Sequence, residues 1–338
     1  MIIGIIGCGG ISRAHIKALS HIKSVKGIAL YDINEQQMRD ASEESLLPVR
    51  LYSTIDELAL NCQGAIICNP NNLHVQSVEE LLKTASIPIV CEKPLSNDLS
   101  SAEKLVNMVD TKSIVSFNYR YNKVIKEIKA TQDSYDLGKL NYFRAEFNKK
   151  SAVTRTHLTW RDSGVNKGSS GALGDLSCHL LDLFCFLSSD EICIDTVKVV
   201  KGTRVRNKEG GQVEVDDNGY VFGQSNSGIN FKIKSSKSED DENLGLHLKL
   251  IYEKGEVLYS TRQEDCLKLS LFDSLGTKVI KFNSEKLISD PKNELPFWSD
   301  SFYHMLSDWC SSINSGNSSL NLPLIKNGLK IQTILEKF

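Results

Sequence analysis

The sequence predicts an α/β protein in which a doubly wound parallel sheet is followed by an α+β part with a large, mainly antiparallel open sheet. Two observations indicate this order. Over residues 1–120, short apolar runs that are typical of buried strands alternate with helical periods, which is the pattern of βαβ units. Between Thr196 and Phe282 the pattern changes to runs with a period of two, as in antiparallel strands that are buried on one face.

The start of the chain has the order strand, glycine turn and helix. Gly7, Gly9 and Ser12 follow the first apolar run at the spacing of a dinucleotide fingerprint. Gly7 would allow the tight turn, Gly9 would let the backbone approach a pyrophosphate, and Ser12 is small enough for the helix to pack on the strand. The N–H groups at the start of the helix favour a phosphate. The alternative is a glycine turn that binds no nucleotide.

A carboxylate ends the second predicted strand, Gly27–Asp32. Asp32 follows Ser12 by about 20 residues, the position at which an acid can bind the adenosine ribose hydroxyls. A 2′-phosphate would meet this negative charge, and the next residues, Ile33 and Asn34, supply no arginine to offset it. The sequence therefore predicts NAD rather than NADP as the cofactor.

Length and charge limit the class of protein. The chain has 338 residues and a formal net charge of −2. We expect two domains, a nucleotide-binding domain over 1–120 and a substrate-binding domain over 121–338. The near-neutral charge indicates no general attraction to nucleic acid or to a membrane surface. No apolar run is long enough to span a bilayer, and the chain enters the first strand at once, which leaves no room for a signal peptide.

The cysteines indicate the compartment. There are nine, an odd number, and none forms a CxxC pair. Many stand in apolar runs, as reduced core cysteines do. The sequence therefore predicts a cytoplasmic protein.

The tripeptide Glu92-Lys93-Pro94 follows a predicted strand of the parallel sheet, Pro88–Cys91. Ligands of such sheets bind at the carboxyl ends of the strands. Beside a bound cofactor, Lys93 could contact a substrate hydroxyl, and Pro94 would restrict the backbone there. The alternative is a surface lysine in a turn.

An acid and a histidine stand four residues apart in a helical period over Ala172–Leu187. Asp175 and His179 would share one face of this helix, where the histidine could act as a general base. The alternatives are an ion pair on the helix surface and a metal site. No third ligand stands nearby in the sequence, and we expect no metal. The later segment Ser235–Asn243 is polar and predicts a solvated hairpin loop.

A basic stretch precedes this helix. Its only acid is Asp162, and Trp160 lies within it; the basic residues are Lys149, Lys150, Arg155, His157, Arg161 and Lys167. Because these cations have so few acids near them in the sequence, we expect them to be unpaired and to form a local site for a phosphate or a nucleotide sugar. Lys150, Arg155 and Arg161 are the candidate phosphate ligands. The alternative is a solvated basic loop.

Several short motifs follow one another along the chain: GCGGIS, NPNNLH, EKPL, NYRY and GDLSCH, with Asp32 between the first two. In this order they resemble the Gfo/Idh/MocA oxidoreductase family along the whole chain. The combination of EKP with DxxxH is the specific part of this resemblance. It implies an N-terminal Rossmann domain, a C-terminal α+β domain with a large open sheet, NAD as the cofactor, and a homodimer or homotetramer formed through that sheet.

The resemblance also implies residue roles. Lys93, Asp175 and His179 would be catalytic, and Asn118 and Arg120 would lie where the domains join. The implied cofactor-binding residues are Gly7, Gly9, Gly10, Ile11, Ser12, Asp32, Asn69, Pro70, Asn71, His74, Glu92, Lys93 and Asn118. With the basic stretch included, the candidate substrate contacts are Lys93, Arg120, Lys150, Arg155, Trp160, Arg161, Asp175 and His179.

The activity implied is oxidation of a secondary hydroxyl of a sugar to a ketone. The segments NKKSAVTR, TWRD and SSGALGD resemble most the family members that act on glucose 6-phosphate at C3. The alternatives are a family dehydrogenase of inositol or a UDP-sugar, an aldose–aldose oxidoreductase that retains its cofactor, and a non-catalytic NAD-binding regulator. The presence of Lys93, Asp175 and His179 together argues against the regulator.

Overall fold

The computed structural model describes residues 1–164, 171–274, 276–289, 295–315 and 321–338. Its contacts divide the chain into two compact units. Unit 1 comprises Met1–Tyr121, Leu287–Ser289 and Ser299–Thr333. Unit 2 comprises the described residues of Asn122–Lys286, Asp290–Trp298 and Ile334–Phe338.

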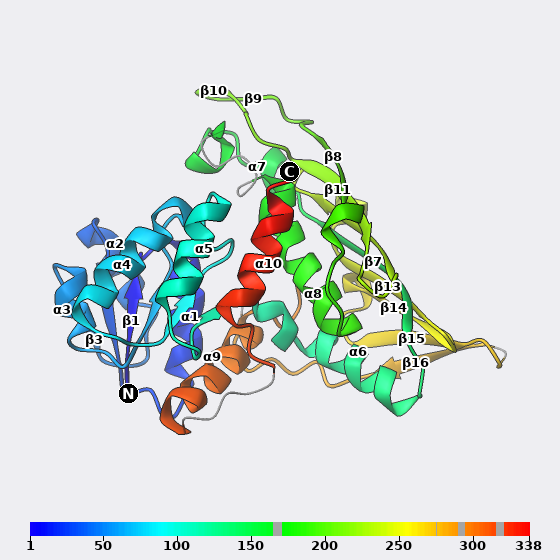
Figure 1. Ribbon diagram of the computed structural model, residues 1–338, viewed down its shortest axis with the longest axis horizontal. Helices are drawn as coiled ribbons and strands as arrows, with labels where there is room; N and C mark the ends of the chain where they lie inside the picture. The colour runs from blue at the N-terminus through cyan, green and yellow to red at the C-terminus, as the bar shows by residue number, and fades with distance from the viewer. Residues whose placement is uncertain (165–170, 275, 290–294, 316–320) are drawn as a thin grey trace. The chain divides into compact units, whose positions relative to one another are not determined.

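Unit 1 is built on a six-stranded sheet in the order β3-β2-β1-β4-β5-β6, in which every neighbouring pair is parallel. In Figure 1 its strands β1 and β3 are labelled in the blue part of the ribbon. The order reverses between β1 and β4, so ligands are expected at the carboxyl ends of these strands. This sheet confirms the prediction of a doubly wound parallel fold. The strands are β1 Ile2–Ile6, β2 Gly27–Tyr31, β3 Val49–Leu51, β4 Gly64–Ile67, β5 Ile89–Cys91 and β6 Ile114–Val115.

Helices connect these strands, and polar side chains start several of them. The side chains of Asn34, Thr54 and Asp98 accept hydrogen bonds from backbone N–H groups in the first turns of α2, α3 and α5, which satisfies donors that have no partner inside the helix. The helices are α1 Gly10–Ser20, α2 Glu35–Ser42, α3 Ile55–Ala59, α4 His74–Thr84 and α5 Leu99–Met108, with 3-10 turns η1 Asn71–Leu73 and η2 Asn118–Tyr121.

Two helices near the end of the chain, α9 (Trp298–Ser315) and α10 (Ile325–Leu335), lie mostly in unit 1. Trp309 of α9 is fully buried, and its ring would lie 2.8 Å from a Cβ atom added at Gly64 of β4. Its indole nitrogen donates to the carbonyl oxygen of Lys112 at 3.1 Å. The division by contacts therefore places these two helices mostly with unit 1, although they follow residue 121 in the chain. A helical period shows that a helix has an apolar face but not which sheet that face covers.

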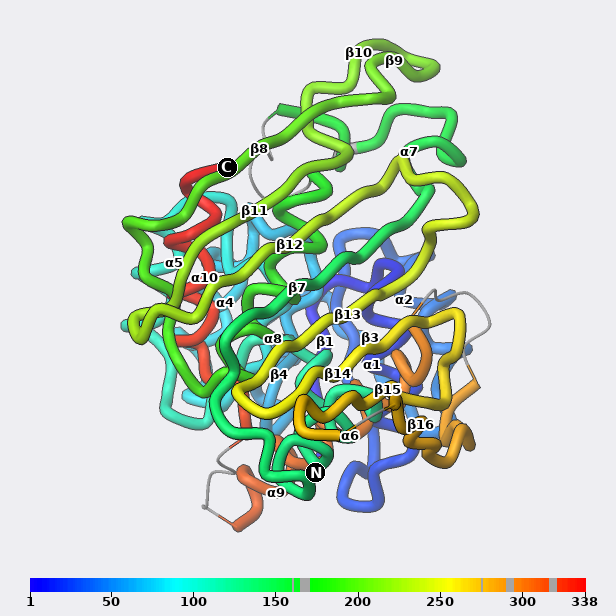
Figure 2. Tube along the Cα trace, turned by 90° about the vertical axis from the view of Figure 1, so that its right-hand side faces the viewer, coloured from blue at the N-terminus to red at the C-terminus, as the bar shows by residue number. Residues whose placement is uncertain are grey.

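Unit 2 is built on an eight-stranded sheet in the order β16-β15-β14-β13-β7-β12-β11-β8 (Figure 2). All neighbouring pairs are antiparallel except β7 and β12, which confirms the prediction of a mainly antiparallel sheet. The strands are β7 Leu140–Asn148, β8 Lys198–Gly202, β11 Asn218–Gln224, β12 Asn230–Ser236, β13 Gly245–Tyr252, β14 Gly255–Ser260, β15 Cys266–Leu271 and β16 Thr277–Lys281.

The two faces of this sheet differ. Alternate residues of β13 are buried, as expected for a sheet with one covered face. On the covered face, Phe184 of α8 (Cys178–Ser188) packs against Phe143 and Phe231, with ring centroids 5.5 and 4.8 Å away.

The remaining helical elements of the unit are α6 Lys123–Ser134, α7 Ser151–Thr154, η3 Trp160–Asp162, η5 Leu173–Ser177, η6 Ile194–Thr196, η7 Asp241–Asn243 and η8 Thr261–Gln263.

A small hairpin, β9 (Asn207–Lys208) and β10 (Gly211–Gln212), anchors the basic stretch. Asp162 is 3% exposed and accepts hydrogen bonds from Lys208 and Arg155, each at 2.8 Å; the Lys208 side chain is 2% exposed. Burial opposes ionisation of Asp162, but hydrogen bonds from Lys208, the Thr159 N–H and Arg155 outweigh it and lower its pKa from 3.8 to about 2.

In the part of the chain that the structure describes, none of the helices is both long and apolar enough to cross a membrane.

Removal of the buried carboxylate should destabilise unit 2. Asp162→Asn leaves the buried ammonium of Lys208 without its counter-ion, and we expect the free energy of unfolding at pH 7 to fall by about 3–5 kcal/mol. Urea denaturation measures this. The control is Asp241→Asn, which removes the partner of Lys150 in an exposed ion pair and should have a much smaller effect.

The pH dependence of stability in wild type and Asp162→Asn provides a second test. Because its pKa is lowered when folded, ionised Asp162 stabilises the protein above pH 4, and this contribution is lost as the pH falls towards 2. The difference in stability between wild type and Asp162→Asn should therefore shrink over that range. Equal stabilities for the Asp162→Asn and Asp241→Asn variants at pH 7 would contradict the interpretation.

Candidate active site

The glycine turn lies between the end of β1 and the start of α1. Gly7 has a φ of +92°, and a Cβ atom there would lie 2.4 Å from the backbone nitrogen of Asn69, so only glycine fits. Gly9 is the N-cap of α1 and provides no side-chain cap for the helix. Gly10 and Ile11 form the first turn, and the hydroxyl of Ser12 donates back to the Gly9 carbonyl oxygen at 2.6 Å.

Asp32 follows β2 at the same edge of the sheet, and both of its carboxylate oxygens are fixed. One oxygen accepts from the Cys8 N–H at 2.7 Å and the other from the Asn34 N–H at 2.8 Å. The carboxylate is therefore held in one orientation beside the glycine turn, as binding of ribose hydroxyls requires.

The turn leaves room and polar groups for a dinucleotide. Cβ atoms added at Gly9 and Gly10 would meet no atom within 4 Å among the described residues. Side-chain oxygens of Asn69 and Asn71 are buried without a hydrogen-bond partner in the described part of the chain. Together with the uncapped N–H groups of α1, these features fit a pyrophosphate and a polar ligand at the carboxyl ends of β1 and β4.

Asn69 and Pro70 connect β4 to η1, and His74 starts α4. The His74 ring is buried, which lowers its pKa and favours the neutral form. Its Nε2 lies 2.9 Å from the Asn69 carbonyl oxygen, and its Nδ1 lies 3.2 Å from the Leu95 carbonyl oxygen and 3.4 Å from the Cys91 sulfur. A neutral ring carries one N–H and can donate to one of the two carbonyl oxygens at a time. His74 thus joins the loops that follow β4 and β5.

Glu92 is buried directly after β5 and pairs with His15 of α1, with Nε2 and Oε1 2.7 Å apart. Burial alone would raise the pKa of Glu92, but the hydrogen bond and charge of His15 and the charge of Lys93 outweigh this effect, so the net shift of the pKa is downward. The N–H of Lys93 donates to the same carboxylate at 3.3 Å, and the peptide bond between Lys93 and Pro94 is cis.

His15 is a polar residue of the site that the motifs in the sequence did not single out. It lies in the helix that follows the glycine turn. A histidine on the buried face of that helix was the available signal, because a buried imidazole needs a polar partner. Two further predicted site residues, Asn118 and Arg120, lie on η2, and both are buried. The side-chain amide of Asn118 donates to the hydroxyl of Ser301 on α9 at 2.7 Å.

In unit 2, Asp175 and His179 lie where η5 passes into α8. The prediction of one α-helix from Ala172 is wrong at its start, because Leu173–Ser177 is π-helical. Tertiary contacts hold this turn: Asp216 accepts from the Leu173 N–H at 2.9 Å, and the hydroxyls of Ser177 and Ser235 lie 2.8 Å apart. π-Helical turns are often found at functional sites. His179 is 6% exposed.

The basic stretch differs from its prediction of unpaired cations. Lys150 pairs with Asp241 at 2.5 Å, Arg155 pairs with Asp162, and His157 pairs with Glu209 at 3.0 Å. The acids Asp241 and Glu209 come from segments distant in sequence, so the local composition did not reveal them. Arg161 lies exposed in η3. Lys167 and the side chain of Trp160 lie outside the described residues.

Within the described residues, no three His, Cys, Asp or Glu side chains are close enough to hold a metal ion.

Comparison with known proteins gives matches along both units. Residues 1–119 match the family described as "Oxidoreductase family, NAD-binding Rossmann fold", and residues 125–258 match the "GFO/IDH/MocA C-terminal domain". A glucose-6-phosphate 3-dehydrogenase of Bacillus subtilis (strain 168) is 32% identical over 342 residues, which cover 99% of this chain and 95% of that protein. A myo-inositol 2-dehydrogenase of Thermotoga maritima is 24% identical over 197 residues, covering 57% of this chain and 56% of that protein.

Among solved structures, levoglucosan dehydrogenase in complex with NADH and levoglucosan has the same fold. Its TM-score is 0.84 at 20% identity, over 100% of this chain and 95% of that one. The family matches confirm the predictions of the Rossmann fold and of NAD as the cofactor. From its domain matches and its full-length relative, the chain belongs to the Gfo/Idh/MocA family of NAD-binding oxidoreductases.

Proposed function

We propose that this enzyme oxidises the C3 hydroxyl of glucose 6-phosphate to a ketone. The observation that carries the proposal is the 32% identity, over 99% of the chain, with the glucose-6-phosphate 3-dehydrogenase of Bacillus subtilis. Conservation of length argues that both units serve the same reaction in the two proteins. A family dehydrogenase of inositol or of a UDP-sugar is the alternative, supported by the weaker match to myo-inositol 2-dehydrogenase.

Lys93, Asp175 and His179 are the proposed catalytic residues. The imidazole of His179 removes the hydroxyl proton, and the ammonium of Lys93 donates a hydrogen bond to the oxygen and stabilises its developing negative charge. Asp175 orients the histidine. Bound NAD supplies the acceptor for the hydride that leaves C3. The proposal requires Lys93 of unit 1 and His179 of unit 2 to reach the same substrate oxygen.

The phosphate of the substrate is assigned to the basic stretch. Its three candidate ligands are Lys150, Arg155 and Arg161, of which the first two form ion pairs with Asp241 and Asp162. Arg161 lies exposed on the short turn η3, and a guanidinium can bind two phosphate oxygens at once. Because of this exposure and this geometry, Arg161 is the phosphate contact that we test.

A homodimer or homotetramer is proposed through the outward face of the unit 2 sheet. On this face the rings of Tyr220 and Phe222 stack at 5.9 Å, and the ammonium of Lys232 lies 5.0 and 5.6 Å from their centroids. A depression of about 640 Å³ adjoins them, lined in part by Tyr142. Half-buried aromatic side chains of this kind are enriched in interfaces.

Turnover should depend on His179. With NAD and glucose 6-phosphate, His179→Ala should lower kcat by about 10²- to 10⁴-fold and leave the Kd for NAD nearly unchanged, because the residue acts on the substrate proton. NADH absorbance measures kcat, and a panel of glucose 6-phosphate, glucose, inositol and UDP-sugars identifies the substrate. An unchanged kcat would overturn the base assignment. NAD binding without turnover of any sugar would instead favour the non-catalytic regulator.

The phosphate contact can be tested separately. Arg161→Ala should raise KM for glucose 6-phosphate by about tenfold and leave KM for glucose unchanged, since only the first carries the phosphate. Arg50→Ala, which removes one exposed arginine from edge strand β3, is the control for the loss of charge. Equal effects of Arg161→Ala on the two sugars would contradict the assignment.

The interface is tested by mass in solution. Light scattering should give at least twice the 37.7 kDa of one chain, and Phe222→Glu should shift the mass towards 37.7 kDa because it places charge among the stacked rings. Val279→Glu, on edge strand β16, is the matched control. A mass that Phe222→Glu leaves unchanged would place the interface elsewhere.

A further inference from the structure

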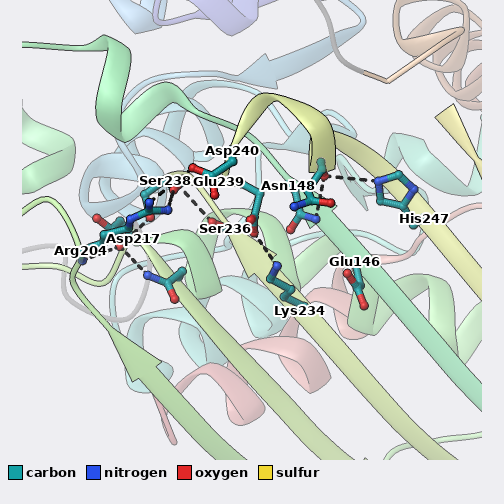
Figure 3. Close-up of polar contacts among 12 residues, drawn as sticks. Glu146, Asn148, Arg204, Asp217, Lys234, Ser236, Ser238, Glu239, Asp240 and His247 are labelled. Carbon is teal, nitrogen blue, oxygen red and sulfur yellow. Dashed lines mark hydrogen bonds and ion pairs between the residues drawn. The ribbon is translucent and has the colours of Figure 1, made fainter. Parts of the chain in front are cut away.

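The end of β12 and the two residues after it are buried, although the composition of Ser235–Asn243 predicts a solvated loop. Ser235, Ser236, Lys237 and Ser238 are all less than 9% exposed, and a lysine is rarely buried without a partner. Figure 3 shows Ser236 and Ser238 among polar side chains from several strands of the unit 2 sheet. The segment therefore belongs to the interior of unit 2, next to the elements that carry Asp175.

The backbone N–H and the carbonyl oxygen of Lys237 each form a hydrogen bond with a segment that is distant in the sequence. Its N–H donates to the Asp217 carbonyl oxygen at 2.6 Å, and its carbonyl oxygen accepts from the Ala152 N–H at 2.7 Å. Asp217 is itself held, because its buried carboxylate accepts from the N–H groups of Arg204 and Val205 at 2.9 and 2.7 Å. Figure 3 shows Asp217 beside Arg204 and Ser238. The base of the Lys237 side chain thus has a defined position.

The ammonium group of Lys237 lies 2.9 Å from a carboxylate oxygen of Asp175. The lysine side chain is 10% exposed and the aspartate side chain 35% exposed, so the pair is only partly screened by water. The positive charge of Lys237 also acts on a second carboxylate, that of Asp216. Burial raises the pKa of Asp216, while a hydrogen bond from Leu173 and the charges of Lys237 and Lys201 oppose the rise.

We propose that Lys237 is a positioning residue for the sugar oxidation, holding the Asp175 carboxylate in the orientation in which it supports His179. The inference rests on the proposed function, which gives Asp175 and His179 their roles. The ammonium of Lys237 also offsets the charge of the Asp175 carboxylate, which stands four residues before His179. Removing the ammonium would leave that negative charge uncompensated and would favour protonated His179, the form that cannot act as a base.

The decisive variants are Lys237→Met and Lys237→Arg. Lys237→Met should lower kcat by about tenfold or more with a smaller change in KM, and should move the acid limb of the kcat–pH profile up by about one unit, because protonated His179 gains from the unneutralised Asp175. Lys237→Arg, which keeps the charge, should restore most of kcat and the original profile. The control is Lys234→Met on β12, where the lysine pairs with Glu239 and not with Asp175.

The protonation of His179 is measured separately by NMR titration of its imidazole, assigned by comparison with His179→Gln. Its pKa should be higher in Lys237→Met than in wild type and Lys237→Arg. This readout needs no turnover, so it decides the inference even where glucose 6-phosphate is not oxidised and the proposed function fails. If Lys237→Met does not fold, Lys237→Gln provides the same comparison. A His179 pKa and a pH profile that match those of Lys234→Met would overturn the proposal, as would a change in KM alone.

Discussion

The turn that follows β1 can form only at a residue without a side chain, and the site of unit 1 is arranged around it. At Gly7 the chain passes so close to Asn69 that even a methyl group would overlap the backbone after β4. This close approach brings together the carboxyl ends of the strands on both sides of the point where strand order reverses. The start of α1, the Asp32 carboxylate and the Glu92 segment consequently lie at one edge of the sheet.

Buried charge is neutralised in this protein by partners from distant parts of the sequence. His15 pairs with Glu92 across 77 residues of chain, and Lys208 pairs with Asp162 across 46. Inside a protein an unpaired charge is costly, so each pair links its two segments. The first connects α1 to the loop that carries Lys93. The second connects the β9–β10 hairpin to the basic stretch.

The π-helical turn before α8 has a similar explanation. Its start is tied to Asp216, and its end is tied through Ser177 to Ser235 on β12. The first contact comes from the connection that precedes β11 and the second from β12, and the turn between them, which carries Asp175, is π-helical. The ion pair with Lys237 adds a third contact from the same side. The orientation of Asp175 is therefore set by the sheet of unit 2 as much as by the helix that carries it.

The sequence by itself determined both sheets, the glycine turn, Asp32 and the chemical motifs around Lys93, Asp175 and His179. These depend on short-range rules: the period of apolar residues, the φ values open to glycine, and the residue types at a turn. Only the tertiary structure decided the partners of Glu92, Asp162 and Asp175. It also decided the π-helical turn and the unit on which α9 packs. Each depends on which distant segments come within a few ångströms, and a local pattern carries no information about that distance.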